Sequence, residues 1–233
     1  MKQAFVVGDV HGMFEMLEEL LTHWQRATQQ LIFVGDLIDR GPNSLAVLEC
    51  VRHLQAEHGA ICLRGNHEAM LWETLIDPET YYGRYERNGG TTTITELLGH
   101  SIEGMSATAI ADELNATQPW LRPWIEQLPL YTEFGNFVIS HAGVDLGLDD
   151  WRRSTQRDFI WIREPFHQAP NRTGREFIFG HTPVMALHGD PSQKSIWHSD
   201  GKHGIDGGAV YGGVLHAVVI DAAHILESYT VGS

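Results

Sequence analysis

The run AFVVGDVHG at residues 4–12 contains the pattern on which the fold is built. Four apolar residues, two of them β-branched, lead into a glycine, and Asp9 and His11 follow immediately. Short apolar runs rich in β-branched residues are typical of buried strands. Carboxylate and imidazole groups are ligands that divalent metal ions accept. The stretch therefore predicts a strand that ends in a metal-binding loop.

The same order of apolar run and polar loop recurs along the chain. LIFV precedes GDLIDRG at 35–41, and AICL precedes RGNHE at 64–68. Two later runs, FVISHAG at 137–143 and FIFGHTP at 177–183, again place a histidine after a strand-like segment. An aspartate after a strand is often only a turn or cap residue. Recurrence of the pattern makes these polar residues candidate ligands instead.

Helical periodicity follows the first two polar loops. After the first loop, apolar residues recur at helical spacing at Phe14, Leu17, Leu20, Leu21 and Trp24. After the second, PNS at 42–44 supplies helix-start residues and Gly59 ends the periodic stretch. The first 76 residues thus alternate strand and helix, which predicts an α/β fold with largely parallel pairing. In such sheets the ligand site lies beyond the carboxyl ends of the strands, where the polar loops fall.

Two stretches differ from the strand patterns. Residues 77–134 contain an aromatic and arginine cluster, the run NGGTTTITELLG and a segment rich in Trp and Pro, while residues 144–176 carry several Trp and Arg. Both are expected to form helical excursions over the sheet. The tail from Gly204 returns to strand patterns with paired glycines, which indicate either a close approach of the backbone or hairpin turns. A chain of 233 residues with 42% hydrophobic content predicts one domain, residues 1–233.

The amino-acid composition limits the kinds of partner and the cellular compartment that we expect for this protein. The net charge is −14, from 30 acidic and 16 basic residues, and this argues against nucleic acid, because a phosphate backbone requires a basic patch. Cys50 and Cys62 form no C-x-x-C pair, so free thiols in a reducing compartment are expected, with one disulfide left open. The first polar loop begins at Gly8 and no apolar run approaches a membrane span. We therefore expect no signal peptide, no membrane partner and a cytoplasmic location.

Five motifs in order carry a resemblance to a known family: GDVHG, GDLIDRG, RGNHE, SHAG and GHTP, between residues 8 and 183. The tail IDGGAVYGG at 205–213 adds to it, with Gly207 where the family usually has Thr. The chain resembles the PPP-type metal-dependent serine/threonine protein phosphatases, especially bacterial and phage members, within the calcineurin-like metallophosphoesterase superfamily. The resemblance implies two mixed β-sheets in a sandwich flanked by helices.

The resemblance also implies a dinuclear metal centre. Two ions roughly 3.5–4 Å apart acidify a water and clamp the oxygens of a phosphoryl group. Oxygen and imidazole ligands suit Mn, and also Fe or Zn, rather than soft copper. By resemblance, the first ion would be held by Asp9, His11 and Asp36. The second would share Asp36 and add three further ligands, Asn66, His141 and His181.

A second set of residues is implied in catalysis. His67 is adjacent to Asn66, and neighbouring side chains in an extended segment point apart, which leaves His67 free for proton transfer. The resemblance makes His67 the general acid for the leaving oxygen, with Asp39 hydrogen-bonded to its other nitrogen. Arg40 and Arg163, the latter in WIRE, match the arginines that clamp phosphate in the family.

The predicted activity is hydrolysis of phosphoserine and phosphothreonine in proteins or peptides, with phosphotyrosine left open. The implied mechanism is direct attack by a hydroxide bound to both metals, without a phosphoenzyme. Two alternatives stand beside it. Symmetrical diadenosine tetraphosphate hydrolases resemble the chain in fold and metal set, but typically have Ala in place of Asp39 and GNHD in place of the GNHE that ends in Glu68. A catalytically silent scaffold should have lost ligands, whereas this sequence retains them.

Other polar residues have less specific roles. His188, His198 and His203 make the loop at 188–203 rich in histidine, which would fit another metal, although a solvated surface loop is the favoured interpretation. Arg64 is expected to pair with a carboxylate beneath the site and is not assigned to catalysis. The sequence does not encode the oligomeric state or the physiological substrate.

Overall fold

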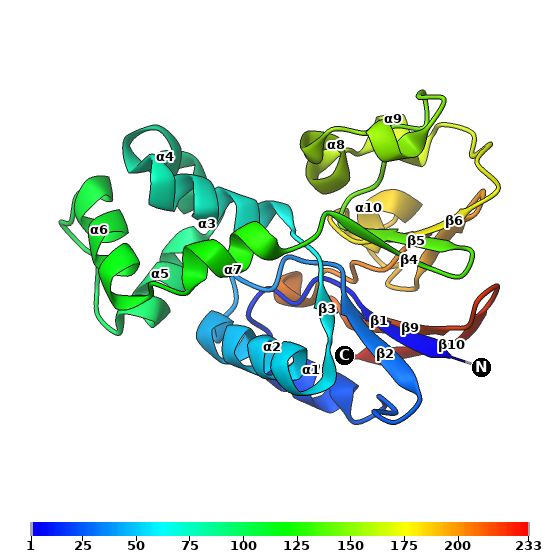
Figure 1. The fold of residues 1–233 in the computed structure, drawn as a ribbon, viewed down its shortest axis with the longest axis horizontal. Coiled ribbons are helices and arrows are strands. Elements are labelled where there is room, and N and C mark those ends of the chain that lie inside the picture. The colour runs from blue at the N-terminus through cyan, green and yellow to red at the C-terminus, as the bar shows by residue number, and fades with distance from the viewer. Residues whose placement is uncertain (1, 233) are drawn as a thin grey trace.

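The computed structural model describes residues 2–232 and places their strands in two sheets. Figure 1 shows the sheets packed face to face, with a separate group of helices at one side. The first sheet has the spatial order β10 (Ile225–Val231), β9 (Leu215–Ile220), β1 (Gln3–Val7), β2 (Gln29–Phe33) and β3 (Ile61–Cys62). The second has the order β4 (Tyr131–Phe134), β5 (Phe137–Ser140), β6 (Glu176–Phe179), β8 (Lys202–Gly204) and β7 (Trp197–Ser199).

Both sheets are mixed. β1, β2 and β3 are parallel, as their alternation with helices predicts, while β9 pairs antiparallel with β1 and with β10. In the second sheet, β5, β6 and β8 are parallel, and β4 and β7 are antiparallel strands at its two edges. The expected sandwich of two mixed sheets is confirmed.

Alternate residues of each central strand face different layers, because successive side chains of a strand point to opposite faces. In β1, Ala4 and Val6 lie in the cluster between the sheets, together with Ile139 of β5 and Ile178 of β6. Phe5 and its neighbours on the outer face pack in the cluster that includes the first two helices. The strands are therefore buried on both sides, which explains their continuous apolar sequence.

Helices α1 (Phe14–Leu21) and α2 (Ser44–His58) cover the outer face of the first sheet (Figure 1). Gly59 ends α2 in a left-handed conformation with φ +64°, as its position in the sequence predicts. Cys50 on α2 and Cys62 on β3 are both free thiols. Across residues 2–232, no helix is both long enough and apolar enough to cross a membrane.

The first excursion is helical over most of its length. Five helices form the side group in Figure 1: α3 (Asn66–Ile76), α4 (Pro78–Arg87), α5 (Gly90–Leu98), α6 (Ala107–Thr117) and α7 (Leu121–Gln127). The expected boundary at 134 is wrong, because residues 131–134 form β4. The run YTEF is rich in aromatic and β-branched residues, which favour strands, and it pairs with β5 across a turn at Gly135.

The second excursion lies over the outer face of the second sheet (Figure 1). It contains a short 3₁₀ turn (Trp151–Arg153), α8 (Gln156–Trp161) and α9 (Glu164–His167). The sheet resumes at Glu176, the last residue of the expected excursion. Beyond it come α10 (Val184–His188) and a second 3₁₀ turn (Ala209–Tyr211). These segments surround the ends of the strands where the polar loops gather.

Candidate metal centre

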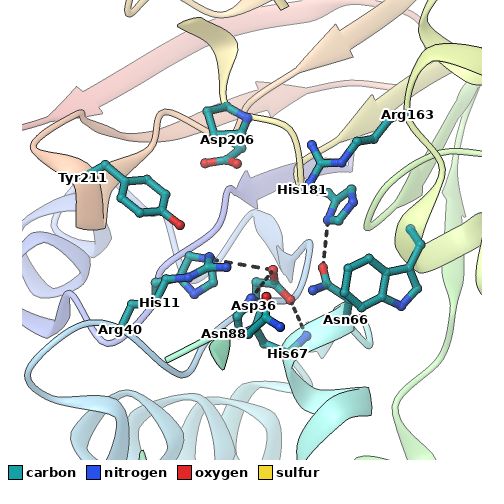
Figure 2. A pocket seen from close by; sticks show the side chains of 12 residues that line it. His11, Asp36, Arg40, Asn66, His67, Asn88, Arg163, His181, Asp206 and Tyr211 are labelled. Carbon is teal, nitrogen blue, oxygen red and sulfur yellow. Dashed lines mark hydrogen bonds and ion pairs between the residues drawn. The ribbon is translucent and has the colours of Figure 1, made fainter. Parts of the chain in front are cut away.

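A polar cavity of 110 Å³ lies at the carboxyl ends of the central strands, where the fold class predicts a ligand site. Figure 2 shows side chains from both sheets and from the helical segments converging on it. Its walls are formed by His11, Asp36, Arg40, Asn66, His67, Asn88, Trp161, Arg163, His181, Pro183, Asp206 and Tyr211. The walls thus contain residues from four of the five motifs, GDVHG, GDLIDRG, RGNHE and GHTP, and from the tail IDGGAVYGG.

The backbone at the site is strained. Positive φ angles occur at His11 (+45°), Asp36 (+49°), Asp39 (+74°), Arg40 (+72°) and His181 (+64°). A non-glycine residue in this region is uncommon, and such conformations persist where the surrounding structure enforces them. All five are residues that the sequence assigns to the metal centre or to catalysis. The strain indicates that the loops are shaped to direct four of these side chains into the cavity and that of Asp39 to His67 beside it.

Asp36 occupies the centre of the cluster. Its Oδ1 accepts a hydrogen bond of 2.9 Å from the backbone N–H of His67. Its Oδ2 lies 3.4 Å from Nε2 of His141 and 3.6 Å from Nε2 of His11. One carboxylate oxygen therefore faces imidazoles from both predicted ligand sets. This placement fits the bridging position that the sequence assigns to Asp36.

The ligands predicted for the second ion meet around Asn66. Its Oδ1 accepts hydrogen bonds from Nε2 of His141 at 2.9 Å and from Nδ1 of His181 at 2.7 Å. The other ring nitrogen of His141 donates to the carbonyl oxygen of Val34 at 3.1 Å. This second contact fixes the ring orientation, as is common for metal-binding histidines. The amide oxygen and both imidazoles thus point at one small volume next to Asp36.

The ligands predicted for the first ion are also close together. Nδ1 of His11 donates to the carbonyl oxygen of Ile38 at 2.7 Å, which leaves Nε2 directed into the cavity, 2.8 Å from Nη1 of Arg40. Oδ2 of Asp9 accepts from the backbone N–H of His181 at 3.0 Å. Oδ1 of Asp9 is buried and has no hydrogen-bond partner. An orphaned buried carboxylate oxygen at this point fits a site for a cation.

The charge balance supports the same conclusion. Burial, the Asp206 carboxylate and Asp36 raise the pKa of Asp9 well above its ordinary value. Burial, with a contribution from Asp36, raises the pKa of Asp206 to about 6. Although burial alone lowers the pKa of His141, the neighbouring Asp36 and Asp9 raise it to about 9. The crowded, buried carboxyl groups therefore resist ionisation in the absence of a cation. Divalent cations would stabilise their ionised forms, so the donor set fits the implied metals.

His67 and Asp39 form a separate hydrogen-bonded pair. Nδ1 of His67 donates to Oδ2 of Asp39 at 2.7 Å, and both residues are fully buried. The sequence interpretation of an extended segment at Asn66-His67 is wrong, because both residues begin α3. Nevertheless, the two side chains diverge: Asn66 faces His141, whereas His67 faces Asp39 and keeps Nε2 4.0 Å from Asp36.

The two predicted arginines line opposite sides of the cavity. Arg40 lies beside Tyr211, with its guanidinium carbon 5.5 Å from the ring centroid. Nη1 of Arg163 donates to Oγ1 of Thr182 at 2.8 Å. Figure 2 shows both guanidinium groups near the imidazoles of the centre. The structure therefore brings both arginines to the site, although they lie 123 positions apart in the chain.

Glu68 has a structural role that the motif alone did not reveal. Its carboxylate accepts backbone hydrogen bonds from Asp36 at 2.9 Å, Leu37 at 2.8 Å and Gly65 at 2.9 Å. It is fully buried, and burial with the nearby Asp36 raises its pKa to about 7. Glu68 thus ties the second polar loop to the start of α3. The only feature of the sequence that pointed to a role for Glu68 was its place as the last residue of the GNHE motif.

Sequence reasoning missed several residues of the cavity. Asp206 was noticed only as part of the tail motif, yet it is buried and faces the predicted metal ligands (Figure 2). Trp161 and Tyr211 supply aromatic walls. Asn88 was not missed: its run NGG resembles a segment near the active-site rim of the family, and Asn88 lines the cavity. A single aspartate before two glycines reads as a turn residue, so its burial against Asp9 could only be seen in three dimensions.

Two further predictions need correction. Arg64 was expected to pair with a carboxylate, but its Nη2 donates to the backbone carbonyl of Glu126 at 2.6 Å. The histidine-rich segment is not simply a solvated loop. Nδ1 of His198 lies 2.9 Å from Nδ1 of His203, which is buried and bonded through Nε2 to Glu176. In the part of the chain that the structure describes, the groups of three or more potential ligands gather around Asp36 instead.

Comparison with known proteins agrees with this geometry. Residues 3–206 match the model of the calcineurin-like phosphoesterase family. A serine/threonine-protein phosphatase 1 from Salmonella typhimurium is 30% identical over 219 residues, covering 92% of this chain and 90% of that protein. An asymmetrical bis(5'-nucleosyl)-tetraphosphatase from Oceanobacillus iheyensis is also 30% identical, over 91% and 86% of the two chains.

Solved structures show the same fold. A protein serine/threonine phosphatase from Saccharomyces cerevisiae superposes with a TM-score of 0.60 at 16% identity, covering 100% of this chain and 80% of that one. A cold-active protein-tyrosine phosphatase from a Shewanella species gives a TM-score of 0.56 at 16% identity, with 99% and 80% covered. The family match extends over most of the sequence and includes the residues that line the cavity, apart from Tyr211. The chain therefore belongs to the calcineurin-like phosphoesterases, a family of enzymes with a dinuclear metal centre.

Proposed function

We propose that this enzyme is a phosphomonoesterase that removes phosphate from phosphoserine and phosphothreonine in proteins or peptides. The observation that carries the proposal is the buried Asp39–His67 pair at 2.7 Å beside the cavity. Alkoxides are strongly basic leaving groups, so their departure requires a positioned acid. A carboxylate that holds one nitrogen of an imidazole leaves the other nitrogen available for that proton transfer.

The metal ions have a defined place in the proposal. Asp9, His11 and Asp36 would hold one ion, and Asp36, Asn66, His141 and His181 the other. When bound, two divalent ions supply charge neutralisation and an acidified water that attacks phosphorus. Mn²⁺ is the first candidate, with Fe and Zn accepted by the same ligand types.

The remaining steps belong to the side chains. Arg40 and Arg163 would bind the equatorial phosphoryl oxygens, because a guanidinium donates two parallel hydrogen bonds. Arg40 would exchange its contact with His11 for the substrate. Nε2 of His67 would then donate its proton to the leaving oxygen as the P–O bond breaks. No step requires a covalent phosphoenzyme, which is consistent with nucleophilic attack by water.

A second candidate is hydrolysis of a diadenosine polyphosphate. Trp161 and the 60%-exposed Tyr211 flank the cavity, and flat aromatic surfaces are suited to stacking on a nucleobase. Relatives named as asymmetrical and symmetrical bis(5'-nucleosyl)-tetraphosphatases, each about 30% identical, favour this alternative. Against it, the leaving group would be a nucleotide phosphate, which has less need of the Asp39–His67 pair.

Turnover of two substrates separates the candidates. The purified protein with Mn²⁺ is offered a phosphothreonine peptide and diadenosine tetraphosphate in parallel, with the Asp36→Asn variant as the blank. We expect a higher kcat/KM for the peptide. Preferential cleavage of the dinucleotide would reject the protein phosphatase assignment and leave the metal ligands in place. A phosphotyrosine peptide in a third assay determines whether aryl esters are also substrates.

A further inference from the structure

The Asp39 carboxylate is held from two directions. Oδ2 accepts the hydrogen bond from His67, while Oδ1 accepts one from the hydroxyl of Tyr85 at 2.6 Å and one from Oγ1 of Thr93 at 2.7 Å. Tyr85 belongs to α4 and Thr93 to α5, in the helical group inserted after α3. This insertion therefore reaches the pair on which the proposed proton transfer depends.

Both hydroxyl groups are placed without access to water. Tyr85, Thr93 and Asp39 each have 0% exposed surface. The backbone N–H of Asp39 donates back to Oγ1 of Thr93 at 2.9 Å, so this hydroxyl both accepts and donates. Burial and the Asp39 carboxylate hold the pKa of Tyr85 well above its usual range, which keeps its hydroxyl protonated as a donor. Hydrogen bonds from neutral donors to a buried carboxylate are among the stronger ones in proteins.

The run NGG between the two helices makes this arrangement possible. A Cβ atom on Gly90 would overlap the ring of Tyr85. Gly89 has φ +91°, its carbonyl accepts the backbone N–H of Arg40 at 3.2 Å, and a Cβ there would lie 2.8 Å from Cγ of Arg40. The turn consequently docks on Asp39 and Arg40 together, and glycine at both positions permits the approach.

We propose that Tyr85 and Thr93 are positioning residues for leaving-group protonation. This inference rests on the proposed role of His67 as the acid. The terminal torsion of an aspartate is soft, so a carboxylate bonded only to His67 could rotate and turn the imidazole away. Two donors on Oδ1 fix the plane of the carboxylate and hence the direction of Nε2.

In the hydrolysis that Tyr85 and Thr93 would support, one P–O bond forms and another breaks. A water attacks phosphorus and forms the new P–O bond, while the bond to the serine or threonine oxygen breaks and its electron pair stays on that oxygen. The proton from Nε2 of His67 converts the oxygen to the alcohol. The proton released by the attacking water restores His67 for the next turnover.

The first test compares alkyl and aryl esters. The variants Tyr85→Phe and Thr93→Val should each lower kcat for a phosphothreonine peptide by about 10- to 100-fold, the loss expected for one hydrogen bond to a charged group. They should lower kcat for p-nitrophenyl phosphate much less, because nitrophenolate departs without a proton. The His67→Asn variant removes the proposed acid completely, so the difference between its kcat losses on the two esters gives the maximum difference expected.

Matched variants separate positioning from loss of structure. Tyr82 lies on the same helix as Tyr85, and its hydroxyl donates to Glu86 at the surface at 3.2 Å. Tyr82→Phe removes only this hydroxyl, so it should leave kcat on the peptide and on p-nitrophenyl phosphate unchanged. Thr93→Ser keeps the hydroxyl and should restore peptide turnover. Tm and bound metal are measured for each variant. Equal losses on both esters would contradict the positioning role.

A second measurement does not depend on turnover. In the Zn²⁺-loaded protein, the proton on Nδ1 of His67 should give a downfield NMR signal because it is shared with Asp39. Tyr85→Phe should shift or broaden this signal, and Tyr82→Phe should not. An unchanged signal in Tyr85→Phe overturns the inference. A wild-type enzyme that cleaves no alkyl ester overturns the proposed function, while a signal that still shifts in Tyr85→Phe keeps the positioning of His67 by Tyr85.

Discussion

At the scale of single residues, Asp36 has the most demanding position in the molecule. It lies between imidazoles from both sheets, adopts a left-handed backbone conformation and donates its backbone N–H to the Glu68 carboxylate. A substitution there changes the charge at the centre without changing the side-chain volume if asparagine is chosen. The metal centre and the chemistry can therefore be tested together.

Asp36→Asn should abolish turnover and reduce bound Mn²⁺ by at least one ion per chain, because an amide offers one oxygen and no charge. Metal content by mass spectrometry and phosphate release measure the two effects. Asp112→Asn, an exposed position on α6, serves as the control and should change neither. Full metal content in Asp36→Asn would refute the bridging assignment.

Arg40→Ala should raise KM and lower kcat together. A bidentate clamp binds the phosphoryl group in the ground state and binds it more tightly as charge develops, so kcat/KM should fall by about 10²-fold or more. Steady-state kinetics on the preferred substrate provide the measurement. Arg52→Ala, on α2 and outside the cavity, should leave the kinetics unaltered; normal kinetics in Arg40→Ala would remove Arg40 from the phosphate site.

At the scale of elements, glycine positions in the helical insertion make a testable contrast. Gly90→Ala places a methyl group against the buried Tyr85 ring, and overpacking of this kind costs about 1–3 kcal/mol. In a protein of this size, Tm should fall by about 2–4 °C for each kcal/mol. Thermal unfolding followed by circular dichroism measures the change.

Gly83→Ala provides the control within α4. The nearest atom to a Cβ there is the far end of the Arg87 side chain, at 3.5 Å. Alanine is favoured over glycine inside a helix by about 0.5–1 kcal/mol, so Tm should stay constant or rise. If Gly90→Ala were as stable as Gly83→Ala, the Tyr85 ring would have moved to accommodate the methyl group without loss of stability, which would contradict the predicted overpacking.

The sequence predicted elements best where periodicity and site chemistry coincided. Strand ends at Asp9, Asp36 and His141 were readable because each apolar run stops at a polar loop. The roles of residues in the helical insertion were harder to predict from sequence. Aromatic residues at helical spacing give the same pattern whether they pack between helices or hydrogen-bond to a proposed catalytic residue. Tyr85 could not be distinguished from Tyr81 or Tyr82 without the fold, since only Tyr85 reaches Asp39.

Asp206 illustrates the other limit of sequence patterns. Asp206 lies in the segment that connects β8 of the second sheet to β9 of the first. Its carboxylate comes close to Asp9 only because the two sheets pack face to face. Local patterning carries information about a strand and the loop after it. It carries little about which of two distant loops will share a cavity, because that depends on tertiary packing.

At the scale of the whole molecule, the centre joins the two sheets. Asp9 and Asp36 follow strands of the first sheet, and His141 and His181 follow strands of the second. In the metal-free chain, these groups are held together by hydrogen bonds and by a charged His141. The stability of that form should consequently depend on pH.

The metal-free protein should lose stability between pH 7 and pH 9. The pKa of His141 is raised from 6.5 to about 9 in the folded chain, so its favourable contribution is complete below 6.5 and is lost as pH rises through about 9. After treatment with a chelator, Tm should fall across this interval. His141→Gln should flatten the slope, and so should saturating Mn²⁺; a Tm independent of pH in the metal-free wild type would contradict the assignment.

The left-handed backbone at Arg40 has a consequence for protein engineering. Its φ of +72° is unfavourable for any side chain except glycine. A screen that rewards heat resistance alone would thus enrich Arg40→Gly, since glycine relieves the strain. The variants selected in this way would have higher thermal stability but would bind phosphate poorly if Arg40 forms the proposed clamp. A thermostable form of this enzyme should therefore be selected with substrate present at every round.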